Sequence, residues 1–301
     1  MCASSRTPVT VRVPATSANL GPGYDSLGLA LSIYDEVTAQ VTDGDTSVIV
    51  EGEGAGSLPS TGDHLVAASF RSAAAALSVT APAVRIHCRN AIPQARGLGS
   101  SSAAIVAGVS LAAHLLSGDP ADADTLLAIA ARIEGHPDNV APCLLGGFTV
   151  AWSRDGTSRA VSREVVEGLS PVVYVPRRHG LTEAARAVLP ETVPHGDAAF
   201  NVARAALAVC AFTTDSSLLF DATDDRLHQT YRATTMPHSA ALVARLRAGG
   251  IAATISGAGP SVLAFTADPP EAEGFELRKL GIGRGACRID ARRAPQVLPF
   301  G

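Results

Sequence analysis

The residues best suited to chemistry in this sequence form a glycine- and serine-rich loop. The run from Pro93 to Ala104 reads Pro-Gln-Ala-Arg-Gly-Leu-Gly-Ser-Ser-Ser-Ala-Ala, after a predicted strand that ends near Arg89 and before an apolar helix. A glycine-rich turn at a helix start leaves several backbone N–H groups unpaired, with the positive end of the helix dipole behind them. The loop is therefore a candidate phosphate-binding site.

The side chains of this loop suit such a site. Gly97 and Gly99 allow a ligand to approach the backbone closely, and Ser100 can cap the helix. A hydroxyl at Ser101 or Ser102 can reach a phosphate oxygen or a magnesium ion. A bare Gly-x-Gly turn is also typical of an ordinary strand-to-helix connection with serine caps. The phosphate interpretation therefore depends on residues elsewhere in the chain.

Composition limits the class of protein. The chain has 301 residues, of which 47% are hydrophobic and 17% charged, so a folded globular protein is expected. The formal net charge of −4 argues against nucleic acid or an anionic membrane as the main partner. Lys279 is the only lysine, and it does not follow a glycine loop, which excludes a Walker-type phosphate site.

Cysteine placement and the absence of targeting segments predict a cytoplasmic location. The cysteines lie far apart without a Cys-x-x-Cys pair, which favours buried reduced thiols over zinc or disulfides. The first thirty residues contain prolines and glycines rather than a basic start and an apolar run, so no signal peptide is expected. The apolar stretch from Ala103 to Leu116 is too short to span a bilayer.

Hydrophobic patterning predicts an α+β fold with two domains. The boundary is placed in or just after the polar stretch 153–162, which gives domains 1–160 and 161–301. In the first domain the patterns predict strands at 9–13, 36–41, 47–50 and 84–89, and helices at 64–77, 99–116 and 125–133. In the second they predict strands at 172–175, 252–255, 262–265 and 285–289, and helices at 181–189, 197–219, 239–248 and 270–280.

The order Pro-x-x-x-Gly-Leu-Gly-Ser-Ser-Ser-Ala resembles the phosphate-binding signature of the GHMP kinases. Two further motifs of that superfamily are matched, Pro-Ala-Thr-Ser-Ala-Asn-Leu-Gly-Pro-Gly-Tyr-Asp at 14–25 and Ile-Ser-Gly-Ala-Gly-Pro-Ser at 255–261. The resemblance covers almost the whole chain. It implies a two-domain fold, with a ribosomal-protein-S5-like N-terminal domain and a ferredoxin-like C-terminal domain, and an ATP- and Mg²⁺-dependent kinase.

Within the superfamily, several segments are similar to the homoserine kinase branch. They are the 14–25 opening, the run Glu-Gly-His-Pro-Asp-Asn-Val-Ala-Pro at 134–142, and the segments 181–186 and 225–232. Leu181 stands where the branch has serine, and Gln229-Thr230 where it has Glu-Pro. The resemblance implies transfer of phosphate from ATP to the side-chain hydroxyl of L-homoserine, giving O-phospho-L-homoserine for threonine biosynthesis. It also implies a homodimer.

The resemblance also implies roles for individual residues. Asn139, Thr182 and Arg186 are expected to be catalytic, and Ser101 and Glu134 to hold the metal. The spacing from Glu134 to His136 is shorter than in some members, which weakens the metal role of Glu134. Substrate binding is expected from Asn19, Asp25, His136, Arg186 and Arg232, and nucleotide binding from Pro93, Arg96, Gly97, Leu98, Gly99, Ser100, Ser101, Ser102, Gly257 and Gly259.

These side chains match the chemistry of the implied substrate. Asp25 suits an ammonium group, and the planar guanidinium groups of Arg186 and Arg232 suit a carboxylate. Asn139 stands where the mevalonate kinase branch has an aspartate, and an amide cannot take a proton, so no side-chain general base is expected. The stretch 61–70 is the expected adenine region.

Three alternatives stay open at this point. The first is a kinase of the same superfamily that acts on another alcohol. The second is a non-catalytic nucleotide-binding or scaffold protein of the same fold, which the polar set Ser101, Glu134, Thr182 and Arg186 disfavours. The third is a serine hydrolase, which the lack of a Gly-x-Ser-x-Gly elbow disfavours.

Overall fold

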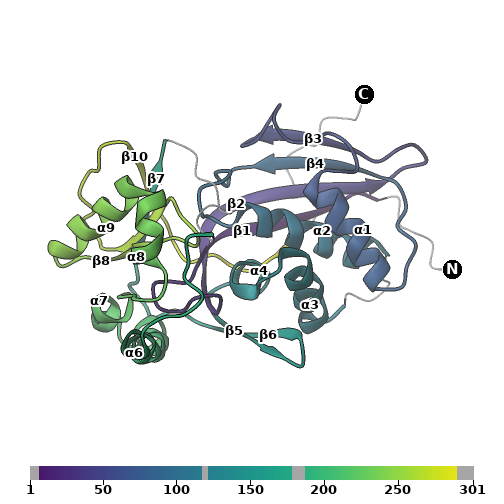
Figure 1. Ribbon diagram of the computed structural model, residues 1–301. Coiled ribbons are helices and arrows are strands. Elements are labelled where there is room, and N and C mark those ends of the chain that lie inside the picture. The colour runs from purple at the N-terminus through teal and green to yellow at the C-terminus, as the bar shows by residue number, and fades with distance from the viewer. Residues whose placement is uncertain (1–6, 117–120, 178–186, 290–301) are drawn as a thin grey trace.

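The computed structural model describes residues 7–116, 121–177 and 187–289, and their strands form two sheets (Figure 1). The strands are β1 (Val9–Ala18), β2 (Leu27–Val41), β3 (Ser47–Gly52), β4 (Val84–Asn90), β5 (Phe148–Arg154), β6 (Thr157–Arg163), β7 (Pro171–Pro176), β8 (Ala252–Ile255), β9 (Val262–Phe265), β10 (Phe275–Lys279) and β11 (Cys287–Ile289). The helices are α1 (Leu65–Ala76), α2 (Ser100–Leu116), α3 (Ala123–Glu134), α4 (Pro137–Leu145), α6 (His195–Thr213), α7 (Leu219–Ala222), α8 (Gln229–Arg232) and α9 (Pro237–Ala248).

The first sheet has the strand order β11-β1-β2-β4-β3, and β5 pairs with both β2 and β6. Its pairs are antiparallel except β3 with β4, which is parallel. The helices α1 to α4 lie on one face of this sheet (Figure 1). The glycine- and serine-rich run from Pro93 to Ala104, called the phosphate loop from here on, leads from β4 into the first turn of α2, so a central strand and a core helix fix both of its ends.

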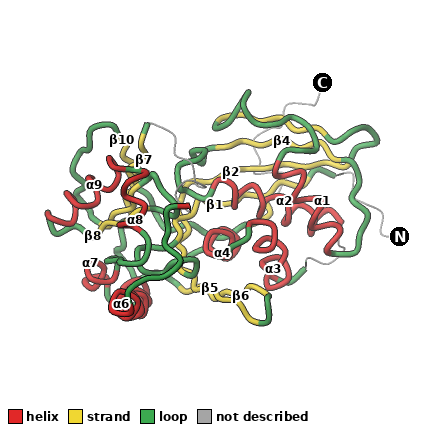
Figure 2. Tube along the Cα trace, in the orientation of Figure 1, coloured by secondary structure: helices red, strands yellow, loops and turns green. Residues whose placement is uncertain are grey.

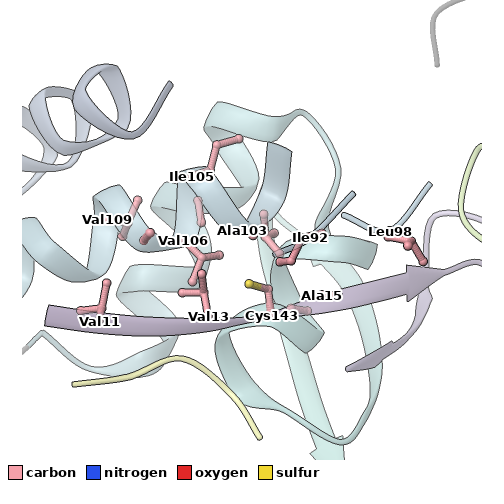
Figure 3. Packing of buried hydrophobic residues seen from close by; sticks show 14 of the residues in the cluster. Val11, Val13, Ala15, Ile92, Leu98, Ala103, Ile105, Val106, Val109 and Cys143 are labelled. Atoms are coloured by element: carbon pink, nitrogen blue, oxygen red, sulfur yellow. The ribbon is translucent and has the colours of Figure 1, made fainter. Parts of the chain in front are cut away.

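The main core lies between the first sheet and these helices. Val11 and Val13 of β1 face Val106 and Val109 of α2, and Cys143 of α4 lies beside them (Figure 3). The helix α2 is apolar almost all round and is buried along most of its length, as its sequence predicts. Because α2 is held by the core on most sides, its N-terminus is a rigid platform for the site.

The second sheet is antiparallel, with the strand order β10-β7-β9-β8. The helix α9 packs against β8 and β9, and the short helix α8 lies just before it in the chain. Figure 2 shows helices and strands mixed in both parts of the molecule. The predicted α+β class is confirmed.

The stretch 153–162, in or just after which the domain boundary is predicted, lies in the β5–β6 hairpin, whose turn is Asp155-Gly156 with positive φ angles of 52° and 74°. An Asp-Gly pair with two positive φ angles is a typical two-residue hairpin turn. The helix expected at 270–280 is instead β10, because Gly274 at φ +81° interrupts the segment and 275–279 pairs with β7.

The division into two domains at residue 160 stays a prediction, and residue 160 lies inside β6. The helix expected at 181–189 falls largely outside the described residues. The helix α4 was not expected from the sequence, because it is short and carries Pro142 in its interior. It places the polar run that follows Glu134 beside the N-terminus of α2.

Candidate active site

The phosphate loop is held in a conformation that needs glycine. Gly97 and Gly99 have φ angles of +71° and +69°. A Cβ on Gly97 would lie 2.4 Å from the carbonyl oxygen of Ser256, and one on Gly99 would lie 1.9 Å from Oγ1 of Thr16. Between them the side chain of Leu98 is buried, and its carbonyl accepts the N–H of Thr16 at 3.0 Å. The loop is therefore anchored on both sides and directs its backbone toward the start of α2.

A second glycine loop, between β8 and β9, packs against the first. Ser256 Oγ lies 2.7 Å from the carbonyl oxygen of Gly97 and 2.8 Å from Oγ of Ser17. The N–H of Gly257 donates to the carbonyl of Ala18 at 3.1 Å. Three segments far apart in the chain therefore meet at the phosphate loop.

A carboxylate and two hydroxyls meet at the first turn of α2. Ser101 Oγ donates to Oε1 of Glu134 at 2.9 Å, and Ser102 Oγ donates to the same oxygen at 2.7 Å. Hard oxygen donors of this kind suit Mg²⁺, which binds few protein ligands beside substrate phosphates. Among the described residues no group of three or more His, Cys, Asp or Glu side chains could hold a metal by itself. The donor set therefore fits a magnesium ion shared with a nucleotide.

The start of α4 places His136 and Asn139 at the same place. Thr16 Oγ1 donates to Oδ1 of Asn139 at 2.8 Å, which leaves the amide NH₂ as the donor of that side chain. His136 Nδ1 lies 2.5 Å from Oδ1 of the buried Asp138. Because an ionised carboxylate can only accept, Asp138 fixes the proton on Nδ1 and leaves Nε2 as the other functional atom of the ring.

The loop after β1 presents Asp25 from a strained backbone. Asn19, Leu20 and Asp25 all have positive φ angles, of 67°, 48° and 53°. Asn19 stabilises this loop, since its Oδ1 accepts the N–H of Asp25 at 3.0 Å and its Nδ2 donates to the carbonyl of Gly257 at 2.9 Å. Non-glycine residues in this region cluster at functional sites. Asn19 thus connects the Asp25 loop to the second glycine loop.

Arg232 reaches the site from α8. Its side chain is 1% exposed, and Nη1 donates to the carbonyl of Gly257 at 3.3 Å. A buried cation needs a strong interaction to offset the loss of hydration. Arg232 therefore supplies the cationic side of the pocket.

One pocket gathers most of the predicted site residues. Those that line it are Asn19, Asp25, Arg96, Gly97, Gly99, Ser100, Ser101, Glu134, His136, Asn139, Arg232 and Gly257. Pro93, Leu98, Ser102 and Gly259 are not among its lining residues, and Thr182 and Arg186 lie outside the described residues. The individual role of each residue stays a prediction.

Arg96 also contacts the backbone that leaves β7. Its Nε donates to the carbonyl of Pro176 at 2.9 Å, and its other guanidinium nitrogens donate to the carbonyls of Gln94 and Arg177 at 3.2 and 3.3 Å. These bonds hold the phosphate loop against the end of β7. A nucleotide-binding role for Arg96 stays a prediction.

A second pocket adjoins the first through Ala95, Ser100 and Ser101. Residues 63–66, within the expected adenine region, line it together with Asp35. His64 Nδ1 accepts the N–H of Val66 at 3.2 Å, and burial lowers the pKa of His64. Burial raises the pKa of Asp35 to about 6, although its carboxylate accepts the N–H groups of Ala91 and Ile92. This pocket can hold a nucleobase whose phosphates extend to α2.

Comparison with known proteins identifies the family. Residues 64–147 match the GHMP kinases N terminal domain, and residues 214–278 match the GHMP kinases C terminal domain. The homoserine kinase of Streptomyces avermitilis is 52% identical over 294 residues, which are 97% of this chain and 96% of that protein. The chain belongs to the homoserine kinase family. The homoserine kinase of Streptomyces coelicolor is 53% identical over 270 residues, 88% of this chain and 87% of that one.

A solved structure agrees with this family. The crystal structure of homoserine kinase from Cytophaga hutchinsonii superposes with a TM-score of 0.81 at 25% identity, over 96% of this chain and 99% of that one. The predicted two-domain GHMP kinase fold is confirmed. The match to the GHMP kinases N terminal domain includes the phosphate loop, Glu134 and Asn139, and the match to the GHMP kinases C terminal model includes Arg232 and Gly257.

Sequence reasoning missed several residues that support the site. Thr16, Asp138 and Ser256 position predicted residues, and His228 contacts Arg232. All four lie inside motifs that the sequence displays. The sequence signal that points to these four residues is that each is a polar residue within one of the matched motifs.

Proposed function

We propose that this protein transfers the γ-phosphate of ATP to the side-chain hydroxyl of L-homoserine, giving O-phospho-L-homoserine for threonine biosynthesis. The observation that carries this proposal is a single pocket in which the phosphate loop meets an anionic group, Asp25, and a cationic group, Arg232. An amino acid presents an ammonium and a carboxylate to such a pair. Relatives named homoserine kinase, about half identical over nearly the full length, support the same substrate.

The substrate would lie between these two charges. Asp25 would bind the ammonium, and Arg232 would bind the carboxylate with its planar fork. We extend the carboxylate role to Arg186 on the resemblance alone, because that residue lies outside the described residues. With both ends fixed, the terminal hydroxyl would extend toward the N-terminus of α2.

The transfer step would depend on positioning and charge neutralisation. Phosphoryl transfer has a loose transition state, so aligning the hydroxyl with the phosphate and stabilising its oxygens are the main tasks of the protein. The amide NH₂ of Asn139 can donate to the hydroxyl oxygen, and it cannot remove the proton. We propose no side-chain general base; the proton passes to the phosphate oxygens as the new P–O bond forms, with Thr182 holding the hydroxyl.

We further propose that Mg²⁺ is the metal of the reaction. Glu134 and Ser101 would hold it, and Ser102 would keep Glu134 oriented through its 2.7 Å hydrogen bond. When bound, the ion supplies positive charge to the phosphate oxygens. Because Gly97 and Gly99 have no side chain, the phosphates can come close to the backbone there, and the N–H groups at the start of α2 can donate to the same oxygens.

Substrate preference tests the proposed function directly. In a coupled assay of ATP turnover, we expect L-homoserine to have the highest kcat/KM among homoserine, L-serine, L-threonine and mevalonate. L-serine is shorter by one methylene, which alone is worth about 10-fold or more in a fitted pocket. Mevalonate lacks the ammonium that Asp25 requires. A higher kcat/KM for any other alcohol would contradict the substrate and leave the kinase class standing.

We propose a homodimer on the basis of one helix face. Val202 is 71% exposed, and it lies on α6 with other exposed apolar residues spaced three or four positions apart, which places them on one side. These residues are Ala199, Val202, Ala203, Ala206, Val209 and Cys210. Small side chains allow the same helix of a second copy to approach closely, and two-fold dimers are the commonest oligomers.

A charge placed on this face tests the dimer. We expect Val202→Glu to shift the mass in sedimentation experiments from dimer toward monomer, because a charge at the centre of an apolar interface is costly to bury. Ile49→Glu is the control, since Ile49 is an exposed apolar residue of β3. A monomeric wild type, or a dimer that survives Val202→Glu, would contradict the proposal.

We also propose a cytoplasmic location. The described cysteines Cys88, Cys143, Cys210 and Cys287 are unpaired, as expected where thiols are kept reduced. In the described part of the chain, no helix has the length and apolar character needed to cross a membrane.

A further inference from the structure

His228 is a fully buried imidazole between α8 and the loop that carries Asp25. Its Nε2 lies 2.8 Å from the carbonyl oxygen of Gly21, and its Nδ1 lies 3.2 Å from Nη1 of Arg232. The ring of Tyr24 packs against it with centroids 5.4 Å apart. One side chain therefore touches both the predicted carboxylate ligand and the backbone of the loop that presents the predicted ammonium ligand.

The two contacts determine the form of the ring. A guanidinium can only donate, so Nδ1 must accept from Arg232, and a carbonyl can only accept, so Nε2–H must donate to Gly21. The ring is therefore the neutral Nε2–H tautomer. Burial is the largest influence and lowers the pKa of His228, Asp225 opposes this, and Arg232 adds to it; Gly21 and Asp25 oppose it more weakly.

Asp225, the nearest carboxylate, is engaged elsewhere. Its Oδ2 is 3.7 Å from Nε2 of His228, beyond hydrogen-bond distance. The same carboxylate accepts the backbone N–H groups of Leu227, His228 and Gln229 at 2.8 to 3.1 Å, and Nδ2 of Asn201 at 3.1 Å. Asp225 therefore caps the start of α8 and leaves the imidazole to Gly21 and Arg232.

We propose that His228 is a positioning residue for substrate binding. Its Nδ1 lone pair holds the Arg232 guanidinium toward the pocket, and its Nε2–H fastens the ring to the loop between Gly21 and Asp25. The inference rests on the proposed function in one respect, which is that Arg232 binds the substrate carboxylate. The acceptor beside Arg232 is the part of His228 on which substrate binding depends, and the bond to Gly21 locates the ring.

Two amide substitutions separate the two contacts of the ring. The side-chain oxygen of Asn can occupy the place of Nδ1, and the side-chain nitrogen of Gln can occupy the place of Nε2. His228→Gln keeps the bond to Gly21 and removes the acceptor beside Arg232. We expect it to raise the KM for homoserine about tenfold, the effect of losing one charge-assisted hydrogen bond, with the KM for ATP and kcat within about threefold. His228→Asn keeps the acceptor, and its KM for homoserine stays within about threefold of wild type.

The control is His238→Gln, at an exposed histidine of α9, for which all parameters stay at the wild-type values. A merely structural role would raise both KM values together, or would affect the Asn and Gln variants alike. Either result would overturn the inference.

A second measurement does not depend on turnover or on the folding of a variant. In wild-type protein with ¹⁵N-labelled histidine, we expect the His228 resonances to show an unprotonated Nδ1 and a protonated Nε2 at neutral pH. A protonated Nδ1 would overturn the positioning role even if homoserine is turned over. Wild-type protein that shows the expected tautomer and does not phosphorylate homoserine would instead overturn the proposed function.

Discussion

Gly99→Ala is expected to lower kcat/KM by about 10²-fold or more, chiefly through weaker ATP binding and slower transfer. The new Cβ would lie 1.9 Å from Thr16 Oγ1 and 3.2 Å from Oδ1 of Asn139, so the loop must move away from β1. A displacement of about 1 Å in positioned reacting groups can cost about 10²-fold in rate. Steady-state kinetics with ATP and homoserine varied in turn measure both parts of the loss.

The matched control is Gly156→Ala in the β5–β6 turn. Gly156 has a φ of +74°, close to that of Gly99, and a Cβ there would meet nothing within 4 Å. Both variants bear the strain of a left-handed residue, about 1–2 kcal/mol of unfolding free energy. Only Gly99→Ala should lose activity. Equal activity in the two variants would show that the phosphate loop is not the nucleotide site.

Glu134→Gln is expected to lower kcat by about 10²-fold to 10³-fold and to raise the Mg²⁺ concentration needed for half-maximal activity. That loss corresponds to about 3–4 kcal/mol of transition-state stabilisation, a size typical of a lost charge at a metal. The amide oxygen of Gln can still accept from Ser101 and Ser102, so the local fold is kept. Titration of activity with Mg²⁺ at saturating ATP measures the shift.

Glu167→Gln serves as the control, because Glu167 is exposed and distant in sequence from the site. It removes the same charge and should leave the Mg²⁺ titration unchanged. If Glu134→Gln retained kcat within about threefold and an unchanged titration, the metal role of Glu134 would be wrong. The short spacing from Glu134 to His136 makes this a stringent test of the resemblance.

The parts of the site that the sequence predicts are those encoded by neighbouring residues. The phosphate loop carries its glycines and serines in one run, and the start of α4 carries His136 and Asn139 in another. Residue types with special backbone or charge properties are visible in such runs without knowledge of packing. The structure brings these runs together in one pocket.

The parts that the sequence does not predict depend on contacts between distant segments. His228 lies inside the matched segment 225–232, but its bonds to Gly21 and Arg232 join segments that are distant in the sequence and are visible only in the structure. The local residue pattern of 270–280 predicts a helix. The segment 275–279 is instead the strand β10, because its pairing with β7 outweighs this local preference. The polar stretch 153–162 is visible in the sequence, but the pairing of the strands on either side of its Asp155-Gly156 turn is not visible from composition.

The pairing of β11 with β1 has a consequence for synthesis of the chain. β11 is the last described strand in the chain, and β1 is the first. β11 forms one edge of the first sheet and pairs there with β1. On the ribosome, the side of β1 that β11 will cover stays bare until nearly all of the later residues have emerged. Unpaired strand edges attract other chains. Until β11 pairs, this edge of β1 in a newly made molecule is therefore open to pairing with another chain.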